Sequence, residues 1–124
     1  VDDRISLVKQ DILTSELNGI GGPFDIVVSN PPYIAADEIK TLQIEVRAFE
    51  PVEALTDGAD GLTFYRRFAA LLPRLLRPGG LLAVEIGYGQ SPAVIEIFSS
   101  RLRDIEVVRD YSGIDRVVLG RMTR

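Results

Sequence analysis

Hydrophobic and polar residues follow two different periods along this chain, and each period predicts one kind of secondary structure. Residues Ile5–Gln10 alternate between apolar and polar side chains, which is typical of a half-buried strand ending at Asp11. The nearly continuous apolar runs Phe24–Ser29 and Leu81–Ile86 predict two buried strands. Strands are therefore expected both early in the chain and after its middle.

Spacings of three and four residues predict helices. The clearest helix follows Asp60, a suitable N-cap residue, kinks at Pro73 and ends at Arg77-Pro78-Gly79-Gly80. Its apolar stripe comprises Leu62, Tyr65, Phe68, Ala69, Leu72, Leu75 and Leu76. A second helix is expected from Ser91-Pro92 to about Arg101, with Val94, Ile97 and Phe98 facing inward.

The remaining segments complete an α/β pattern. Asp37 is expected to cap a short helix carrying Ile39, Leu42 and Val46, whereas Pro51–Gly61 is expected to be a loop. The last runs, Ile105–Asp110 and Arg116–Leu119, flank a Ser112-Gly113 turn and predict an antiparallel hairpin. Strands that alternate with helices indicate a mostly parallel sheet, to which this C-terminal hairpin adds one antiparallel strand.

Composition narrows the possible functions. The 124 residues suffice for one domain, and 46% of them are hydrophobic, without a run long enough to span a membrane. The chain lacks cysteine and histidine, which excludes thiolate chemistry and a Ser-His triad and removes the commonest metal ligand, so no metal is expected. A net charge of −4 argues against non-specific nucleic-acid binding, and the lack of cysteine agrees with a cytoplasmic location.

The tetrapeptide Asn30-Pro31-Pro32-Tyr33 is the candidate site, because it follows the Phe24–Ser29 strand at the edge where open α/β sheets bind ligands. The two prolines stiffen the backbone and leave carbonyl acceptors free. Asn30 adds a side-chain oxygen and Tyr33 a flat apolar face, a combination that suits a planar group bearing NH2. Local features alone favour a strand-terminating turn with a core tyrosine. The letters also match a linear Asn-Pro-x-Tyr adaptor signal, but such a signal needs an exposed, flexible segment, and the buried strand directly upstream argues against it.

Such an NH2 group is a poor nucleophile because its lone pair is delocalised. Hydrogen bonds from both of its N–H groups to the Asn30 side-chain oxygen and the Pro31 carbonyl would orient it towards an electrophilic methyl group. The same bonds would stabilise the positive charge that grows on nitrogen. Glu85, in an otherwise apolar strand, is expected to need a structural hydrogen-bond partner, and Arg66-Arg67 is expected to be a solvated helix face.

Together with its flanking motifs, the tetrapeptide resembles the signature of the release-factor glutamine N5-methyltransferases, the HemK/PrmC family of class I S-adenosylmethionine-dependent enzymes. The matching motifs are Asn30-Pro31-Pro32-Tyr33-Ile34, Glu45-Val46, Phe49-Glu50-Pro51, Asp60-Gly61-Leu62, Phe64-Tyr65-Arg66-Arg67, Pro78-Gly79-Gly80, Glu85-Ile86-Gly87-Tyr88-Gly89-Gln90 and Asp115-Arg116-Val117-Val118. The resemblance covers nearly the whole chain. It implies a Rossmann-like sheet and the transfer of a methyl group to the side-chain amide of a glutamine in a peptide chain release factor.

The resemblance also implies roles for individual residues. Asn30, Pro31, Pro32 and Tyr33 would be the catalytic and substrate-binding residues that hold the glutamine, and Asn30 would border the methionine end of S-adenosylmethionine. Asp11 and Ile12 match the family's step beside the adenine. Two positions depart from the family pattern there, since Ile12 replaces a bulky aromatic residue and Gln10 replaces a glycine.

Other parts of the family's catalytic domain have no counterpart here. The glycine-rich cofactor loop, the acidic residue for the ribose hydroxyls, strands 1 and 2, and the N-terminal helical recognition domain are unmatched. Residues 1–124, which begin with Val1 rather than Met, are therefore expected to be the later half of an incomplete catalytic domain. In the family's sheet the seventh strand lies between the fifth and the sixth, so residues 24–121 are expected to form strands four, five, seven and six in that order.

The missing strands also set expectations for this chain taken alone. The strand at Ile5 would lose its neighbours and lie elsewhere or pair with another chain, and an exposed sheet edge would favour self-association. The isolated fragment is expected to be inactive. Two other functions stay open: an amino-methyltransferase acting on adenine or cytosine, which the acidic balance disfavours, and a non-catalytic oligomerising or complementing fragment.

Overall fold

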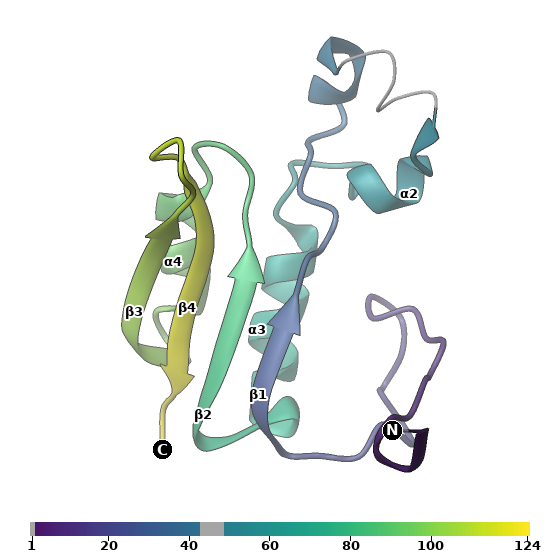
Figure 1. The fold of residues 1–124 in the computed structure, drawn as a ribbon, viewed down its shortest axis with the longest axis vertical. Coiled ribbons are helices and arrows are strands. Elements are labelled where there is room, and N and C mark those ends of the chain that lie inside the picture. Colours follow the sequence, from purple (N-terminus) through teal and green to yellow (C-terminus); the bar gives the residue numbers. More distant parts are fainter. Residues whose placement is uncertain (1, 43–48) are drawn as a thin grey trace.

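Four strands form a single sheet in the computed structural model, which describes residues 2–42 and 49–124. The strands are β1 (Phe24–Ser29), β2 (Leu76–Glu85), β3 (Leu102–Arg109) and β4 (Asp115–Met122), and their order in the sheet is β1-β2-β4-β3 (Figure 1). β1 pairs with β2 in parallel, and β4 is antiparallel to both β2 and β3. Three strands thus share one direction and only β4 opposes them. The expected order, four-five-seven-six, and the expected C-terminal hairpin are confirmed.

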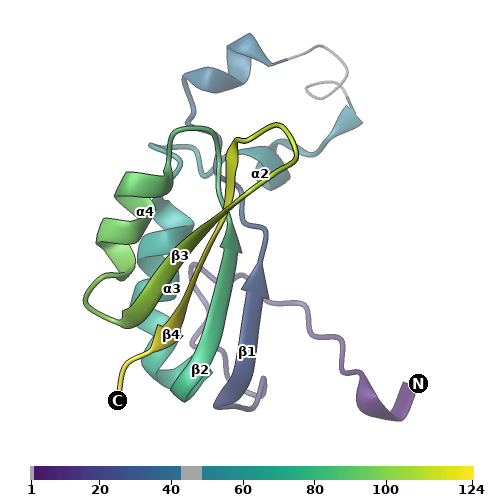
Figure 2. The same ribbon diagram turned by 60° about the vertical axis from the view of Figure 1, so that its left-hand side comes forward.

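Two helices, α3 (Thr63–Leu75) and α4 (Ser91–Phe98), cover one face of this sheet (Figures 1 and 2). The predicted apolar stripe of α3 faces the sheet, with Tyr65 and Leu72 fully buried against β2 residues such as Leu82. Asp60 does not cap the helix as expected: the N-cap residue is Leu62, whose N–H donates to the Asp60 carboxylate at 3.0 Å. α4 ends three residues earlier than predicted.

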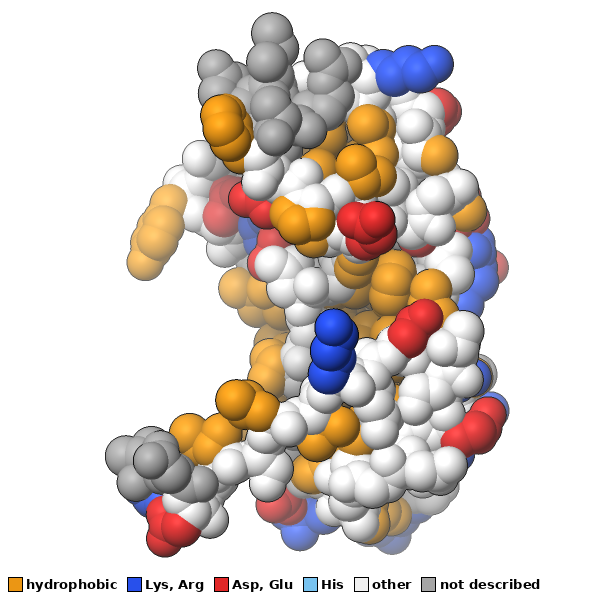
Figure 3. Space-filling model, turned by 90° about the vertical axis from the view of Figure 1, so that its right-hand side faces the viewer, with side chains coloured by type: hydrophobic (Ala, Val, Ile, Leu, Met, Phe, Trp, Pro, Cys, Tyr) orange, Lys and Arg blue, Asp and Glu red, His pale blue; other side chains and the backbone are white. Residues whose placement is uncertain are grey.

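The opposite face of β1 is bare, so the prediction of a buried strand was half wrong. Ile26 and Val28 are 59% and 76% exposed, because no described element covers this face and β1 lies at the edge of the sheet. Figure 3 looks onto this edge and shows hydrophobic side chains along a hollow in the surface. The continuous apolar run therefore predicted the strand correctly, but it did not predict that one face of the strand would be exposed.

The predicted strand Ile5–Gln10 is wrong. These residues have no regular structure, lie exposed, and extend from the body beside β1 after a short 3₁₀ helix, η1 (Asp2–Arg4) (Figure 2). A strand is held by its pairing with neighbours, and the described residues offer none here. The expectation that this segment would lie away from the sheet is confirmed, and Leu7 is 94% exposed as a result.

The stretch expected to end the long helix is instead part of β2, which begins at Leu76. Phe24 pairs with Leu76 and Ile26 with Leu81, so β2 carries extra residues in a bulge at this point. Gly80 packs against the β1 backbone there, where an added Cβ would lie 3.1 Å from the carbonyl oxygens of Phe24 and Asp25. The Pro-Gly-Gly signal therefore marks a bulge inside a strand rather than a loop before one.

Two short helices lie near the carboxyl end of β1. η2 (Glu38–Thr41) follows Asp37, whose side chain makes no capping bond, and the Val46 position expected in this helix lies outside the described residues. α2 (Val52–Leu55) interrupts the segment expected to be a loop. Among the described residues no helix is both long and apolar enough to cross a membrane.

Candidate functional site

The tetrapeptide Asn30–Tyr33 starts where β1 ends, next to the carboxyl end of β2. Asn30 is exposed, Pro31 is buried, and Tyr33 is half-buried. Asn30 and Glu85 open into one cavity of about 320 Å³ on the bare side of the sheet, which Ser29, Val28, Ala83 and Val117 complete. No hydrogen bond within the described ranges uses the Asn30 side chain, so its carbonyl oxygen is available to a ligand.

Tyr33 and the next residue, Ile34, are fixed at three points. Its hydroxyl donates to Glu85 Oε1 at 3.1 Å, which supplies the structural partner expected for this carboxylate. Burial raises the pKa of the Tyr33 hydroxyl, and the bond to Glu85 raises it further, so the hydroxyl stays protonated as a donor. The Tyr33 carbonyl accepts from Gln90 Nε2 at 2.8 Å, and the next residue, Ile34, donates its N–H to Leu55 of α2 at 3.0 Å. The tetrapeptide is therefore held to β2, α2 and the loop before α4.

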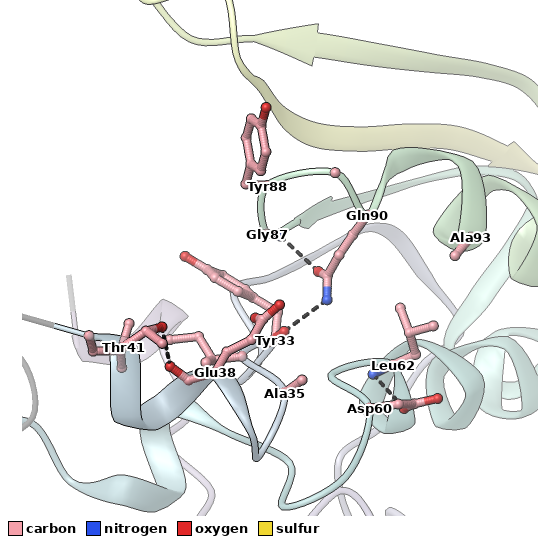
Figure 4. Close-up of a pocket in the computed structure, with 13 residues that line it drawn as sticks. Tyr33, Ala35, Glu38, Thr41, Asp60, Leu62, Gly87, Tyr88, Gln90 and Ala93 are labelled. Carbon is pink, nitrogen blue, oxygen red and sulfur yellow. Dashed lines mark hydrogen bonds between the residues drawn. The ribbon is translucent and has the colours of Figure 1, made fainter.

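A second and larger cavity, about 610 Å³, has Tyr33 in its wall (Figure 4). Residues from four segments line it, among them Tyr33, Glu38, Leu62, Tyr88 and Gln90. Tyr88 is 83% exposed at its rim. Tyr33 lines this larger cavity and Asn30 lines the smaller one, so the tetrapeptide contributes residues to both cavities.

The loop before α3 is organised by Asp57, which sequence reasoning treated only as a turn residue. Asp57 Oδ1 accepts from the N–H groups of Ala59 and Gly61 at 2.8 and 3.0 Å, and Oδ2 accepts from Thr63 N–H at 3.0 Å. Burial opposes ionisation of Asp57, but the bonds from Thr63, Ala59 and Gly61 outweigh it and hold the pKa below its usual value of 3.8. Asp57 therefore serves as an anion at the start of α3.

Acidification should test this anchor. Because the pKa of Asp57 is lower in the folded chain than in the unfolded chain, its contribution is complete above pH 3.8 and is lost as the pH falls through the folded value. We expect the free energy of unfolding, measured by urea denaturation, to fall less steeply between about pH 5 and 3 in Asp57→Asn than in the unsubstituted chain. Asp37→Asn is the control, since Asp37 makes no capping bond, and it should keep the original slope. An unchanged slope in Asp57→Asn would contradict this role.

The two other candidate residues lie in a separate turn. The Asp11 carboxylate accepts from Leu13 N–H at 2.9 Å and is otherwise exposed. Ile12 lines an apolar cavity of about 400 Å³ with Phe24 and Phe68, and this cavity shares Val28 and Ser29 with the cavity of Asn30. The structure therefore brings Ile12 near the end of β1, whereas the Asp11 side chain serves its own turn.

Arg67 ties that turn to α3, which corrects the expectation of a solvated side chain. Its Nε donates to the Ile12 carbonyl at 2.9 Å and its NH2 group to the Ser15 carbonyl at 2.8 Å. Sequence reasoning missed Arg67 because a basic pair on a helix is usually solvated. It also missed Gln90 and the polar role of Tyr65, whose hydroxyl donates to the Glu85 main-chain oxygen at 2.8 Å.

Comparison with known proteins places this geometry in context. A protein of Caulobacter vibrioides named release factor glutamine methyltransferase is 53% identical over 122 residues, covering 97% of this chain and 41% of that protein. A protein of the same name from Clostridium acetobutylicum is 43% identical over 120 residues, covering 96% and 42% respectively. This chain is homologous to part of the release factor glutamine methyltransferases. The resemblance inferred from the motifs is thereby confirmed.

A solved structure agrees with the sequence relatives. The protein-(glutamine-N5) methyltransferase (release factor-specific) of Alicyclobacillus acidocaldarius is 32% identical, with a TM-score of 0.54, and the match covers 88% of this chain and 55% of that one. The α/β fold expected of a partial class I methyltransferase is thus confirmed. A scan against models of protein families found no match. The chain spans about two fifths of the length of the curated relatives named above.

Proposed function

We propose that this chain is part of a methyltransferase that acts on the glutamine side chain of a peptide chain release factor. It would form the half of the catalytic domain that binds the amide group of that glutamine. The observation that carries the proposal is the position of Asn30-Pro31-Pro32-Tyr33 at the carboxyl end of β1, with Asn30 and Glu85 in one cavity. Relatives that are 43% and 53% identical carry the corresponding name. The same proposal places the chain in the cytoplasm, where peptide chain release occurs.

The chain's own residues would hold and orient the amide. Asn30 Oδ1 and the Pro31 carbonyl would accept the two N–H groups of the glutamine amide, while Tyr33 packs against its flat face. These acceptors draw electron density towards nitrogen and stabilise the positive charge that develops as the N–C bond forms. The proton released from nitrogen would pass to water. The larger cavity lined by Tyr33 offers room for residues that flank the glutamine.

S-adenosylmethionine would supply the electrophilic methyl group. The apolar cavity of Ile12, Phe24 and Phe68 fits a flat base, and its neighbour contains Asn30, so the described residues suit the two ends of this molecule. We assign Asp11 and Ile12 to the adenine side and Asn30 to the methionine side. Neither cavity offers a carboxylate to the ribose hydroxyls in the described part of the chain other than Glu85, which already bonds Tyr33.

That shortage supports the view of residues 1–124 as the later half of a catalytic domain. The bare face of β1 agrees with it, because Ile26 and Val28 would be covered by further strands and helices. The same bare face also favours the second candidate, a non-catalytic module that associates with another chain through this edge. Methylation of adenine or cytosine lacks a comparable observation, since Glu38, Asp60 and Glu85 line the two cavities to which the tetrapeptide contributes.

Calorimetric titration with S-adenosylmethionine distinguishes the half of a catalytic domain from the non-catalytic module. We expect no binding heat with this chain alone, and binding once the part of the Caulobacter relative that this chain does not match is supplied in trans. The mixture should then methylate a release-factor peptide but not the same peptide with its glutamine changed to alanine. Binding by the chain alone would contradict the half-domain reading, and no binding in either case would leave the non-catalytic module.

A further inference from the structure

One side-chain amide, that of Gln90, joins three loops behind the tetrapeptide. Gln90 Oε1 accepts from Gly87 N–H at 2.8 Å, and the Tyr65 hydroxyl, whose proton points mainly to the Glu85 main-chain oxygen, lies 3.4 Å from it. Gln90 Nε2 donates to the Tyr33 carbonyl at 2.8 Å and to the Gly61 carbonyl at 3.4 Å. Figure 4 shows this side chain between Gly87 and Tyr33. The amide oxygen is therefore bonded by a donor, and the amide nitrogen donates to carbonyl oxygens.

The backbone packs closely around Gln90 on both sides, and at Gly61, where φ is +79°, glycine is required. A Cβ at Gly61 would lie 2.8 Å from Gln90 Nε2 and 2.4 Å from the Tyr33 carbonyl oxygen. A Cβ at Gly87 would lie 3.0 Å from Gln90 Oε1 and 3.0 Å from the Tyr33 ring. The two loops thus close directly onto the Gln90 amide and the Tyr33 backbone, which leaves the amide little freedom to move.

The bonding pattern is specific for an amide. Donors approach Oε1 and carbonyls approach Nε2, so a carboxylate of the same shape would place an oxygen 2.8 Å from the Tyr33 carbonyl oxygen. An apolar side chain of similar length would leave the Tyr33 carbonyl and Gly87 N–H without partners. The hydrogen bond to the Tyr33 carbonyl also affects the position of Asn30 and the Pro31 carbonyl. Pro31 and Pro32 restrict the backbone between these groups, so fixing Tyr33 limits where the other two can lie.

We propose that Gln90 is a positioning residue of the methyl-accepting site, which holds the Tyr33 backbone so that the Asn30 oxygen and the Pro31 carbonyl are set at the spacing of a primary amide. The inference rests on the proposed function for its chemistry. The anchoring of the tetrapeptide by Gln90 does not depend on the proposed function, because it can be measured without turnover.

Gln90→Glu and Gln90→Met test the proposal, with Glu96→Gln on the exposed side of α4 as the control. The anchoring readout is the nuclear magnetic resonance spectrum of the labelled chain. In both variants the signals of the Asn30 side-chain amide and the Ile34 N–H should shift, while those of the β3–β4 hairpin stay in place. Lower pH should partly restore the original spectrum in Gln90→Glu, because a protonated carboxyl again donates to the Tyr33 carbonyl, and should not restore it in Gln90→Met.

The catalytic readout is methyl transfer in the complemented mixture described above. A misplaced acceptor pair should lower kcat about 10- to 100-fold and leave KM for S-adenosylmethionine unchanged. Unshifted Asn30 and Ile34 signals, or a loss confined to KM, would overturn the proposal. A mixture without turnover in the unsubstituted chain would count against the proposed function alone, because the spectra would still decide whether Gln90 anchors the tetrapeptide.

Discussion

Gly61→Ala is expected to lower the free energy of unfolding by about 3 kcal/mol, the largest loss expected here from adding a single methyl group. Gly61 has a φ of +79°, where a Cβ costs about 1–2 kcal/mol in most residues. The same Cβ would lie 2.4 Å from the Tyr33 carbonyl oxygen, and such overpacking adds about 1–3 kcal/mol more. Urea denaturation followed by circular dichroism measures the loss.

Gly113→Ala provides a matched control for this prediction. Gly113 has the same φ of +79°, but a Cβ there would meet no atom within 4 Å. Only the backbone penalty remains, so we expect a loss of about 1–2 kcal/mol. The difference between the two variants isolates the close approach of the Gly61 loop to Tyr33. Equal losses would show that this approach is looser than the structure has it.

Asn30→Ala is expected to reduce methyl transfer in the complemented mixture by about 100-fold or more, because it removes one of two preorganised acceptors at the developing charge. The effect should fall on kcat, since the acceptor is most important when nitrogen becomes positive. Stability should change little, as Asn30 is exposed and no described residue bonds its side chain. Steady-state kinetics with the release-factor peptide gives both parameters.

Two further variants sharpen this test. Asn30→Asp keeps an acceptor oxygen at the same position and should retain more activity than Asn30→Ala. Asn18→Ala alters the other asparagine of the chain, which lies exposed in the turn before β1, and should leave methyl transfer unchanged. If Asn30→Ala and Asn30→Asp lost activity equally, an acceptor role for Asn30 would be contradicted.

Sequence patterns predicted this fold best where an apolar face is covered by another element of the same chain. The stripe through Tyr65 and Leu72 packs as predicted because β2 lies directly beneath α3. The pattern of Ile5–Gln10 is just as regular, yet it forms no strand, because alternation describes a surface ready to pair and not the partner itself. The Pro-Gly-Gly of β2 was wrongly interpreted as the end of a helix. Bulges inside strands use the same residues as loops, so the sequence alone does not distinguish them.

The candidate site shows the same division. The position of Asn30 and Tyr33 directly after β1 was predictable because proline pairs at a strand end leave few conformations open. Gln90 was not, although it lies in a motif that the resemblance already included. Its importance comes from the meeting of Tyr33, Gly61 and Gly87, which are distant in sequence. A signal was present in those two glycines, but only coordinates reveal that the space they leave is filled by one amide.

The position of β4 has a consequence for the order in which the chain folds during synthesis. β4 follows β3 in the sequence but lies between β2 and β3 in the sheet. β2 and β3 therefore share no hydrogen bonds, and β3 can join the sheet only after β4 has left the ribosome. The β3–β4 hairpin has a short connection and forms quickly, whereas its docking onto β2 closes a longer loop. We infer that the nascent chain keeps an open edge on β2 until residues 115–122 emerge, and that the sheet then closes in one late step.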